Sequence, residues 1–338
     1  MARTKKVKQK FHARLKDEFD FDVSNIGAYV DEQSEDILVA LIEGGSLVSR
    51  VQVMEGVKGS EKIKLLEMDT PLQSAENCGK TPDGNIIFHD KTISSVPVKI
   101  DMSTCNKTLK STWAQILLSL GKRAEKEDLP LDDVIAAFVI KRGRLKNQDI
   151  MFKGDTASAN PDLVHYDGYI KKWKADPLIP AQTFAGPTTA ANAFARYVQV
   201  ANAASSKLLD NGIKPELIMP RAEAKKIVAN IWADKDYNAL LNVKEEGAEM
   251  SFELPTTNIT VRTYSQLAEG TLTEVGANAP EVYLVPYEFM FFATDLEGDI
   301  DEFWLKYEEI QEKLFFGAEW GSGVEYVYPE YFGKIVLT

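Results

Sequence analysis

Apolar and polar residues alternate over the last sixty residues, which predicts β-strands in this part of the chain. An apolar run at 282–287 comes first, and an acidic bend at 295–302 follows it. One face of the next segment carries, at a period of two, Leu314, Phe316, Ala318 and Trp320. The alternation resumes at Val324, Tyr326 and Tyr328. Such strands need a partner surface and carry few groups that could do chemistry.

The best-formed helical pattern begins at Leu129 and Pro130. Proline suits the first turn of a helix, and Asp132 and Asp133 suit the positive end of the helix dipole. The apolar stripe at helical spacing consists of Leu131, Val134, Ile135, Phe138 and Val139. Basic residues follow at 141–146, where their sign is again favourable. We therefore predict a long helix over 129–147.

Weaker patterns predict the remaining elements. Helices are expected at 34–42, 106–120, 187–210 and 222–232, and strands at 47–53, 217–219 and 259–264. The segment 300–311 fits both a helix face and a strand face, and periodicity does not decide between them.

Residues 60–101 predict a long two-stranded excursion. We expect one arm at 62–66 and part of the other at 96–100, with turn chemistry at 81–85. An isolated two-stranded hairpin is poorly stable, so a neighbouring surface should hold it. The residues expected at its tip are Pro82, Asp83, Gly84 and Asn85.

Charge is unevenly distributed along the 338 residues. The formal net charge is −12, but the first sixteen residues carry seven basic residues and no acid. This tail is expected either to meet a polyanion or to be a solubilising terminus. Its contact with nucleic acid would be sensitive to salt and blind to sequence. The basic residues are Arg3, Lys5, Lys6, Lys8, Lys10, Arg14 and Lys16.

Composition and motifs argue against a membrane-spanning helix, a signal peptide and a disulfide framework. The chain has no apolar stretch of about 18 residues, and its N-terminus lacks the apolar core of a signal peptide. Two cysteines, Cys78 and Cys105, do not make a disulfide framework, and we expect both to be reduced when the protein is made. Whether they ever pair stays open.

The sequence predicts no catalytic residue, no metal site and no cofactor. The sequence GKT at 79–81 ends like a phosphate-binding loop, but Ser74 stands where that loop needs glycine. The acidic bend lacks the glycine position of a calcium loop. The three histidines, His12, His89 and His165, lie far apart, and neither HExxH nor Cys-x-x-Cys occurs. A cysteine–histidine pair, Cys78 with His89, is read as incidental.

Eight short segments resemble, by their order along the chain, segments of the major capsid proteins of tailed bacteriophages, in particular of a branch that infects Bacteroidetes-type hosts. They are GVKGS at 56–60, KIKLL at 62–66, NCG at 77–79, CNKTL at 105–109, LPL at 129–131, FKGDT at 152–156, ATDL at 293–296 and WGSGV at 320–324. The chain thus resembles proteins with the Hong Kong 97-type fold, and this favours a strand and hairpin for 300–311.

The resemblance implies an α+β fold with four parts. Residues 1–58 would be an N-terminal arm and 59–105 an extended β-hairpin loop that lies over an adjacent subunit. Residues 106–175 together with 275–338 would form a peripheral domain with a spine helix, and 176–274 an axial domain. The chain has no long N-terminal scaffolding segment, so a scaffold would be a separate or cleaved protein. No lysine–asparagine crosslink pair can be named.

The resemblance also implies a non-enzymatic function. The chain would assemble with itself into hexamers and pentamers of an icosahedral phage head enclosing double-stranded DNA. Portal, scaffold and decoration proteins are the further partners that it implies, and no membrane is involved. The protein would assemble in the bacterial host cytoplasm and reside in the virion. Three alternatives stay open: an encapsulin-like cargo shell, an enzyme with an unrecognised site, and a nucleic-acid-binding accessory protein acting through residues 1–16.

Overall fold

The computed structural model describes residues 46–69, 85–105, 131–204, 208–209, 212–233, 242–246, 249–255, 257, 259–267, 282–295, 303–308 and 313–337. They belong to two compact units, which we describe separately. The first consists of Met1–Ala40, Lys99–Ile140 and Asp299–Glu319, and the second of Leu41–Val98, Lys141–Gly298 and Trp320–Thr338. The predicted helices at 34–42 and 106–120 lie outside the described residues.

The first unit contains a three-stranded arrangement around the start of one long strand. Strand β13 (Lys313–Tyr326) begins here and pairs antiparallel with β12 (Phe303–Glu308), so that Phe303 lies opposite Ala318 and Glu308 opposite Lys313. Strand β4 (Val96–Cys105) also pairs with β13. The ambiguous segment 300–311 therefore contains a strand of a hairpin, as the resemblance favoured. Helix α4 (Leu131–Lys153) also begins in this unit.

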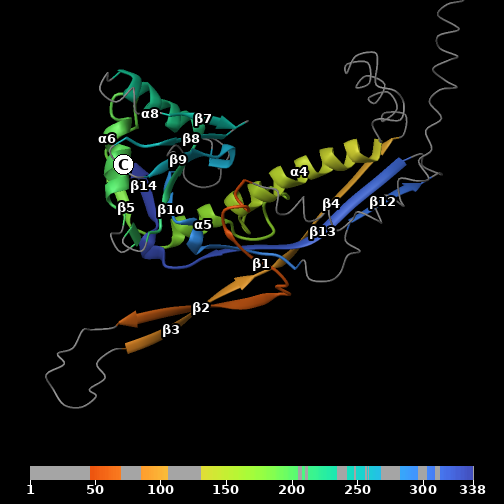
Figure 1. Cartoon of the computed structure of the whole chain (residues 1–338). Coiled ribbons are helices and arrows are strands. Elements are labelled where there is room, and N and C mark those ends of the chain that lie inside the picture. Colours follow the sequence, from red (N-terminus) through yellow and green to blue (C-terminus); the bar gives the residue numbers. More distant parts are fainter. Residues whose placement is uncertain are drawn as a thin grey trace, which may run out of the picture. The chain divides into compact units, whose positions relative to one another are not determined.

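The second unit is organised around a seven-stranded mixed sheet (Figure 1). Its strands, in spatial order, are β5 (Ala181–Phe184), β14 (Gly333–Leu337), β10 (Tyr283–Val285), β6 (Glu216–Met219), β9 (Thr260–Thr263), β8 (Glu249–Glu253) and β7 (Lys244–Glu246). The predicted strands at 217–219 and 259–264 are its central members β6 and β9, which run parallel to each other.

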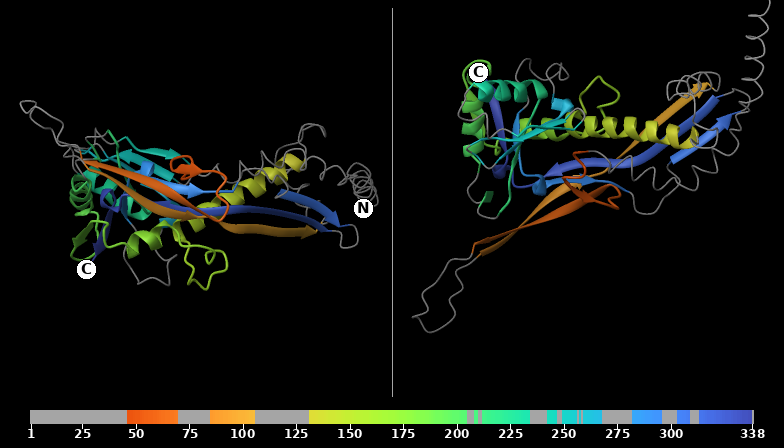
Figure 2. Two further views of the ribbon diagram at one scale, coloured as in Figure 1. Left: turned by 90° about the horizontal axis from the view of Figure 1, so that it is seen from below. Right: turned by 45° about the horizontal axis from the view of Figure 1, so that its top comes forward.

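Two helices cover one face of this sheet (Figure 2). They are α6 (Ala193–Asn202) and α8 (Arg221–Ala233), which correspond to the helices expected at 187–210 and 222–232. Alternate strand residues, among them Leu217, Met219 and Leu284, pack against the buried stripes of both helices. The hydroxyl of Tyr197 donates to the carboxylate of Glu223 at 2.9 Å, which satisfies a buried polar pair in this layer.

Aromatic side chains cover the other face. Trp173, on helix α5 (Tyr169–Ala175), is fully buried, and its ring centroid lies 4.9 Å from that of Tyr283 and 5.9 Å from that of Phe332. At the end of α4, the ring centroid of Phe152 lies 5.2 Å from that of Tyr264. The sheet is therefore enclosed on both faces within the unit.

Two boundaries differ from the sequence-based expectation. The segment 47–53 was expected to be a strand, but residues 46–50 form a turn in which Arg50 N donates to Leu47 O at 2.9 Å. Only β1 (Gln52–Met54) is extended, and it pairs in parallel with β11 (Met290–Ala293). The helix expected to end near 147 continues to Lys153. Among the described helices, none is long and apolar enough to cross a bilayer.

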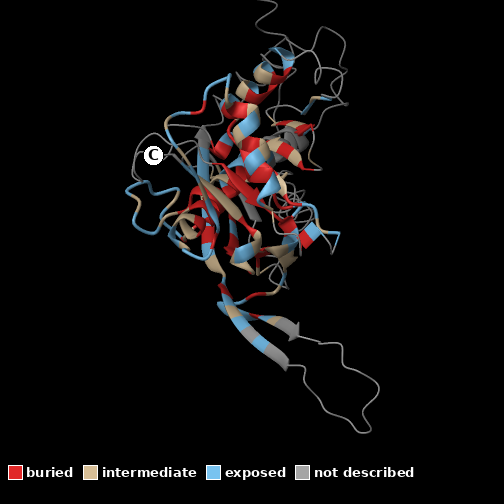
Figure 3. Cartoon of the chain, turned by 90° about the vertical axis from the view of Figure 1, so that its left-hand side faces the viewer, coloured by how far each residue is buried: buried red, intermediate tan, exposed pale blue. Residues whose placement is uncertain are grey.

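The predicted excursion is a hairpin of β2 (Ser60–Asp69) and β3 (Asn85–Ser94), paired antiparallel over their full lengths. The expectation that 96–100 forms its second arm is wrong, because these residues belong to β4, which pairs with β13. Ser95 lies between β3 and β4. Its N–H donates to Gly59 O at 2.7 Å, and this hydrogen bond closes the base of the hairpin. Away from its base, most described residues of the hairpin are exposed (Figure 3).

Candidate assembly site

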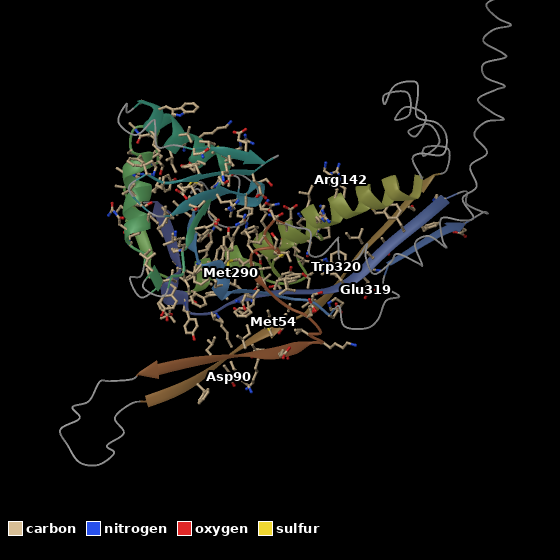
Figure 4. The ribbon with its side chains drawn as sticks, viewed as in Figure 1. Met54, Asp90, Arg142, Met290, Glu319 and Trp320 are labelled. Atoms are coloured by element: carbon tan, nitrogen blue, oxygen red, sulfur yellow. The ribbon has the colours of Figure 1, made fainter. Side chains whose placement is uncertain are left out.

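The base of the hairpin is held by a small apolar cluster, which we call the hairpin root. Ile63 on β2 and Ile93 on β3 are buried there, Ile93 completely. They pack with Val57, Ala293 and Val327, which come from three other segments of the chain. The partly buried side chains around this cluster include those of Met54, Leu65, Phe289, Phe291 and Tyr328. Figure 4 labels Met54 beside the hairpin and Asp90 on β3.

Glycines of β13 allow the hairpin root to approach the strand closely. A Cβ atom placed on Gly323 would lie 1.9 Å from the backbone oxygen of Ser94, which no side chain tolerates. A Cβ on Gly321 would similarly meet Ser95 Oγ at 2.3 Å. The sequence WGSGV at 320–324 therefore provides the surface against which the end of β3 is seated.

Backbone hydrogen bonds connect the segments that carried the family resemblance. Thr294 N donates to Met54 O at 2.9 Å, and Val57 N donates to Thr294 O at 3.0 Å. The neighbouring Asp295 carboxylate accepts a hydrogen bond from Gly321 N. The segments 56–60, 293–295 and 320–324 thus meet at one place, the hairpin root. Asp295 begins the segment that the sequence pattern predicts as an acidic bend, and it is half-buried in this contact.

A buried carboxylate adds a charged contact at the root. Glu325 on β13 is only 8% exposed and accepts a hydrogen bond from Lys172 of α5 at 2.7 Å. Lys91 of the hairpin lies 3.3 Å from the other oxygen of the same carboxylate. The Lys91 ammonium also lies 3.8 Å from the centroid of the Tyr326 ring, within the range of a cation–π interaction. The hydroxyl of Tyr326 donates to Asp176 at 2.6 Å, and burial raises the pKa of this tyrosine.

Polar contacts join the end of α4 to the same strand. The hydroxyls of Tyr166 and Ser322 lie 2.8 Å apart, and Ser322 Oγ donates to Asn147 Oδ1 at 3.4 Å. All three side chains are buried, and burial raises the pKa of Tyr166. The middle residue of the GSG sequence therefore faces away from the hairpin and fixes β13 against the body of the unit.

A second charged group follows the end of α4. Lys171 donates to Asp155 at 2.5 Å and to Asp167 at 2.7 Å. The hydrogen bond from Lys171 lowers the pKa of Asp155, and the same contacts raise the pKa of Lys171. This group is an ion-pair network that holds the loop after α4, within the FKGDT sequence at 152–156.

Beyond the root, the hairpin has a different surface. Lys62 and Asp90 form an exposed ion pair across the two strands, with 3.0 Å between Nζ and Oδ2. Further toward the tip, Phe88 is 73% exposed. Its register partner on β2 is Leu66. A single exposed aromatic residue is not unusual on a protein surface, but this one lies on a two-stranded ribbon, which is marginally stable by itself.

Most of the residues predicted from sequence as sites fall outside the described part of the chain. This holds for Pro82, Asp83 and Gly84, for Cys78, and for the basic residues Arg3, Lys5, Lys6, Lys8, Lys10, Arg14 and Lys16. Asn85 is the first residue of β3 and lies opposite Asp69. Cys105 ends β4. His165 is exposed, and the described residues contain no group of three potential metal ligands.

Sequence reasoning missed the two most informative side chains. Glu325 had a signal, because it is an acid between Val324 and Tyr326 in an otherwise apolar strand, but its lysine partners come from distant segments. Phe88 was overlooked because the second arm of the hairpin was assigned to 96–100 rather than to β3.

Comparisons with known proteins give matches at the level of structure. No family model and no curated protein matches the chain. A chain in the satellite phage P4 procapsid, a structure that includes the size determination protein, is 11% identical, with 90% of this chain and 99% of that chain covered and a TM-score of 0.55. A chain in the capsid of an empty GTA particle is also 11% identical, with coverage of 86% and 89% and a TM-score of 0.52.

A chain in the structure of Gordonia phage Cozz is 10% identical and has a TM-score of 0.52, with 86% of each chain covered. These matches cover 86–90% of this chain. The chain has the Hong Kong 97-type capsid fold. The predicted fold class is thereby confirmed. The division into arm, loop, peripheral and axial parts stays a prediction.

Proposed function

We propose that this protein is the major capsid protein of a tailed phage, a structural protein that assembles with copies of itself into an icosahedral head. The first support is the capsid fold, shared with chains from a phage P4 procapsid and a GTA capsid. The second is the role of the charged groups at the candidate site, which act as structural contacts between segments of the chain. The ion pairs at Glu325 and Lys171 each hold separate segments together.

The observation that carries the proposal is the contrast between the root and the outer hairpin. The root is fixed by buried Ile63 and Ile93, whereas Phe88 further out is 73% exposed. Two strands in water are marginally stable at best, because one face finds no packing partner. A second copy of the chain lying against the outer hairpin would cover this surface. This supports the expected role of the hairpin, which lies within the predicted loop at 59–105, as a segment that lies over an adjacent subunit.

The remaining assignments extend the proposal. The residues Arg3 to Lys16 would face double-stranded DNA inside the head, and the acidic remainder of the chain would limit adhesion of DNA to the shell wall. Portal, scaffold and decoration proteins would be further partners. Assembly would take place in the cytoplasm of a bacterial host, with hexamers and pentamers formed around the axial domain at 176–274.

Purified protein tests the proposal directly. We expect light scattering to detect capsomers or larger particles and negative-stain micrographs to show rings or closed shells. A variant of the chain tests the role of the hairpin tip. An Asn-Gly turn replaces residues 70–84 in this variant, which keeps β2 and β3 and removes the predicted tip with Pro82, Asp83 and Gly84. It should fold and yield few particles. A chain that stays monomeric at high concentration would refute the proposal.

The contact of the N-terminal tail with DNA is tested separately, by the salt dependence of DNA binding. Deletion of residues 1–16 removes seven positive charges. We consider the slope of the logarithm of the DNA association constant against the logarithm of the salt concentration. If each of these charges contacts a phosphate, the magnitude of this slope should decrease by about six in the deletion variant, since each phosphate contact contributes about 0.9. Shells should still form without the tail. Loss of all assembly in this variant would instead favour an accessory protein that acts through the tail.

A further inference from the structure

One carboxylate at the hairpin root is shared by lysines from two elements. Lys172 of α5 lies 2.7 Å from Glu325 Oε2 and also donates to Val324 O at 2.6 Å. Lys91 of β3 lies 3.3 Å from Glu325 Oε1. The Lys91 side chain keeps 30% of its surface exposed, whereas that of Glu325 keeps 11%. The Lys172 side chain keeps 27%, so both lysines are partly exposed and the carboxylate between them is the most buried member of the group.

This arrangement limits the cost of separating Lys91 to the loss of one ion pair and of its cation–π contact with Tyr326. Breaking a buried ion pair normally costs several kcal/mol, because one charge remains buried without a partner. Here Glu325 would keep Lys172, and it also accepts from Tyr326 N at 3.2 Å. Lys91, already partly exposed, would be hydrated on leaving. Neither charge would be left buried and uncompensated.

The backbone next to the root can accommodate such a movement. Gly59, just before β2, has φ of +87°, and a Cβ placed there would meet nothing within 4 Å. Its carbonyl accepts the hydrogen bond from Ser95 N that closes the hairpin. Glycine tolerates a wide range of φ and ψ, so β2 can change direction at this point without side-chain collisions.

We infer that Lys91 and Glu325 form a releasable latch, which fixes the direction of the hairpin at its root and opens when a neighbouring copy of the chain takes up the outer hairpin. This inference rests on the proposed function. Lys172 is the positioning residue of the latch, because it keeps the carboxylate compensated in both states. Gly59 is the hinge.

Hydrogen exchange of the full-length chain, measured by mass spectrometry before assembly, tests the latch. In Lys91→Met, amides of β2 and β3 should exchange roughly fivefold faster than in the wild type, the scale expected for a partly buried ion pair. Lys62→Met is the matched control, because it removes the same charge from the same hairpin at an exposed pair. It should change exchange by less than about twofold. Lys91→Arg should restore protection.

Equal exchange in Lys91→Met and the wild type would overturn the latch, and so would equal acceleration in the Lys62 and Lys91 variants. Acceleration of the core strands β6 and β9 to the same extent would assign Lys91 to general stability, which also overturns it. Because exchange is measured on unassembled chains, this result is independent of particle formation. A wild type that never assembles would refute the proposed function and leave the exchange comparison intact as a separate readout.

Discussion

The seven-stranded sheet and the hairpin show that strand length does not decide whether a β-structure is self-sufficient. The sheet is built from strands as short as the three residues of β10, all of them buried. The hairpin has two ten-residue strands in continuous register, but most of its described residues beyond the root are exposed. The sheet is enclosed by α6 and α8 on one face and by aromatic residues of α4, α5 and the C-terminal segment on the other.

The comparison separates two kinds of stability. The sheet is stabilised by burial within one chain, whereas the hairpin has good backbone pairing and lacks a covering layer. Backbone hydrogen bonds add only about 0.5–1.5 kcal/mol each, because they replace hydrogen bonds to water. Burial of apolar surface supplies the larger part. Mutations in the two regions should therefore affect different properties.

The largest loss of stability is expected in the enclosed sheet. Trp173→Ala would remove a fully buried ring that contacts Tyr169, Tyr283 and Phe332. The free energy of unfolding should fall by about 3–5 kcal/mol, as for other buried aromatic truncations. Chemical denaturation monitored by circular dichroism measures this. Trp232→Ala is the control, because Trp232 is 62% exposed, and a similar loss there would contradict the layered interpretation.

A smaller loss is expected where the hairpin meets the body. Gly323→Ala places a methyl group against the backbone oxygen of Ser94, so β3 or β13 must shift. We expect a loss of about 1–3 kcal/mol, the range for overpacked sites. Hydrogen exchange should show the change in β3 and not in β6. Glu319→Ala, an exposed position on the same strand, should be nearly neutral, and equal effects would show that the close approach is unimportant.

The ion pairs after α4 should contribute less, and only within a pH window. Asp155 has a lowered pKa in the folded chain, so its contribution is present above the ordinary carboxyl range and is lost as pH falls through the folded pKa. Lys171 has a raised pKa, so its contribution is lost as pH rises through that value. Asp155→Asn should cost less than about 1 kcal/mol at pH 7. The difference between the two proteins should disappear in acid, and a constant difference would contradict this assignment.

The smallest effect on the subunit is expected at Phe88. Phe88→Ser changes an exposed side chain, so the free energy of unfolding should move by less than about 0.5 kcal/mol. The yield of particles should nevertheless fall sharply, because the covering surface of the neighbour loses its aromatic contact. Thr92→Ala, an exposed change on the same strand, should leave the yield unaltered. Normal assembly of the Phe88 variant would show that the outer hairpin is not an interface.

The sequence predicted elements better than it predicted partners. Periodicity located α4, α8, β6, β9 and β13, because these patterns are local. It failed to find the second arm of the hairpin, since the sequence pattern indicated 96–100 and only the three-dimensional register shows that 85–94 pairs with β2. It also treated 47–53 as one strand, although the buried Leu47 and Val48 lie in a turn. Burial at these positions comes from packing against distant segments.

Alternation of apolar residues, the proline and acidic residues at the start of the helix predicted at 129–147, and the order of short motifs were properties of the sequence alone. They determined the α+β class and the resemblance to capsid proteins. Tertiary structure alone decided that the segments at 56–60, 293–295 and 320–324 meet at one hairpin root, and that Lys91 and Lys172 share Glu325. The physical reason is that strand pairing and ion pairing depend on distances between atoms far apart in the chain, to which a local pattern is blind.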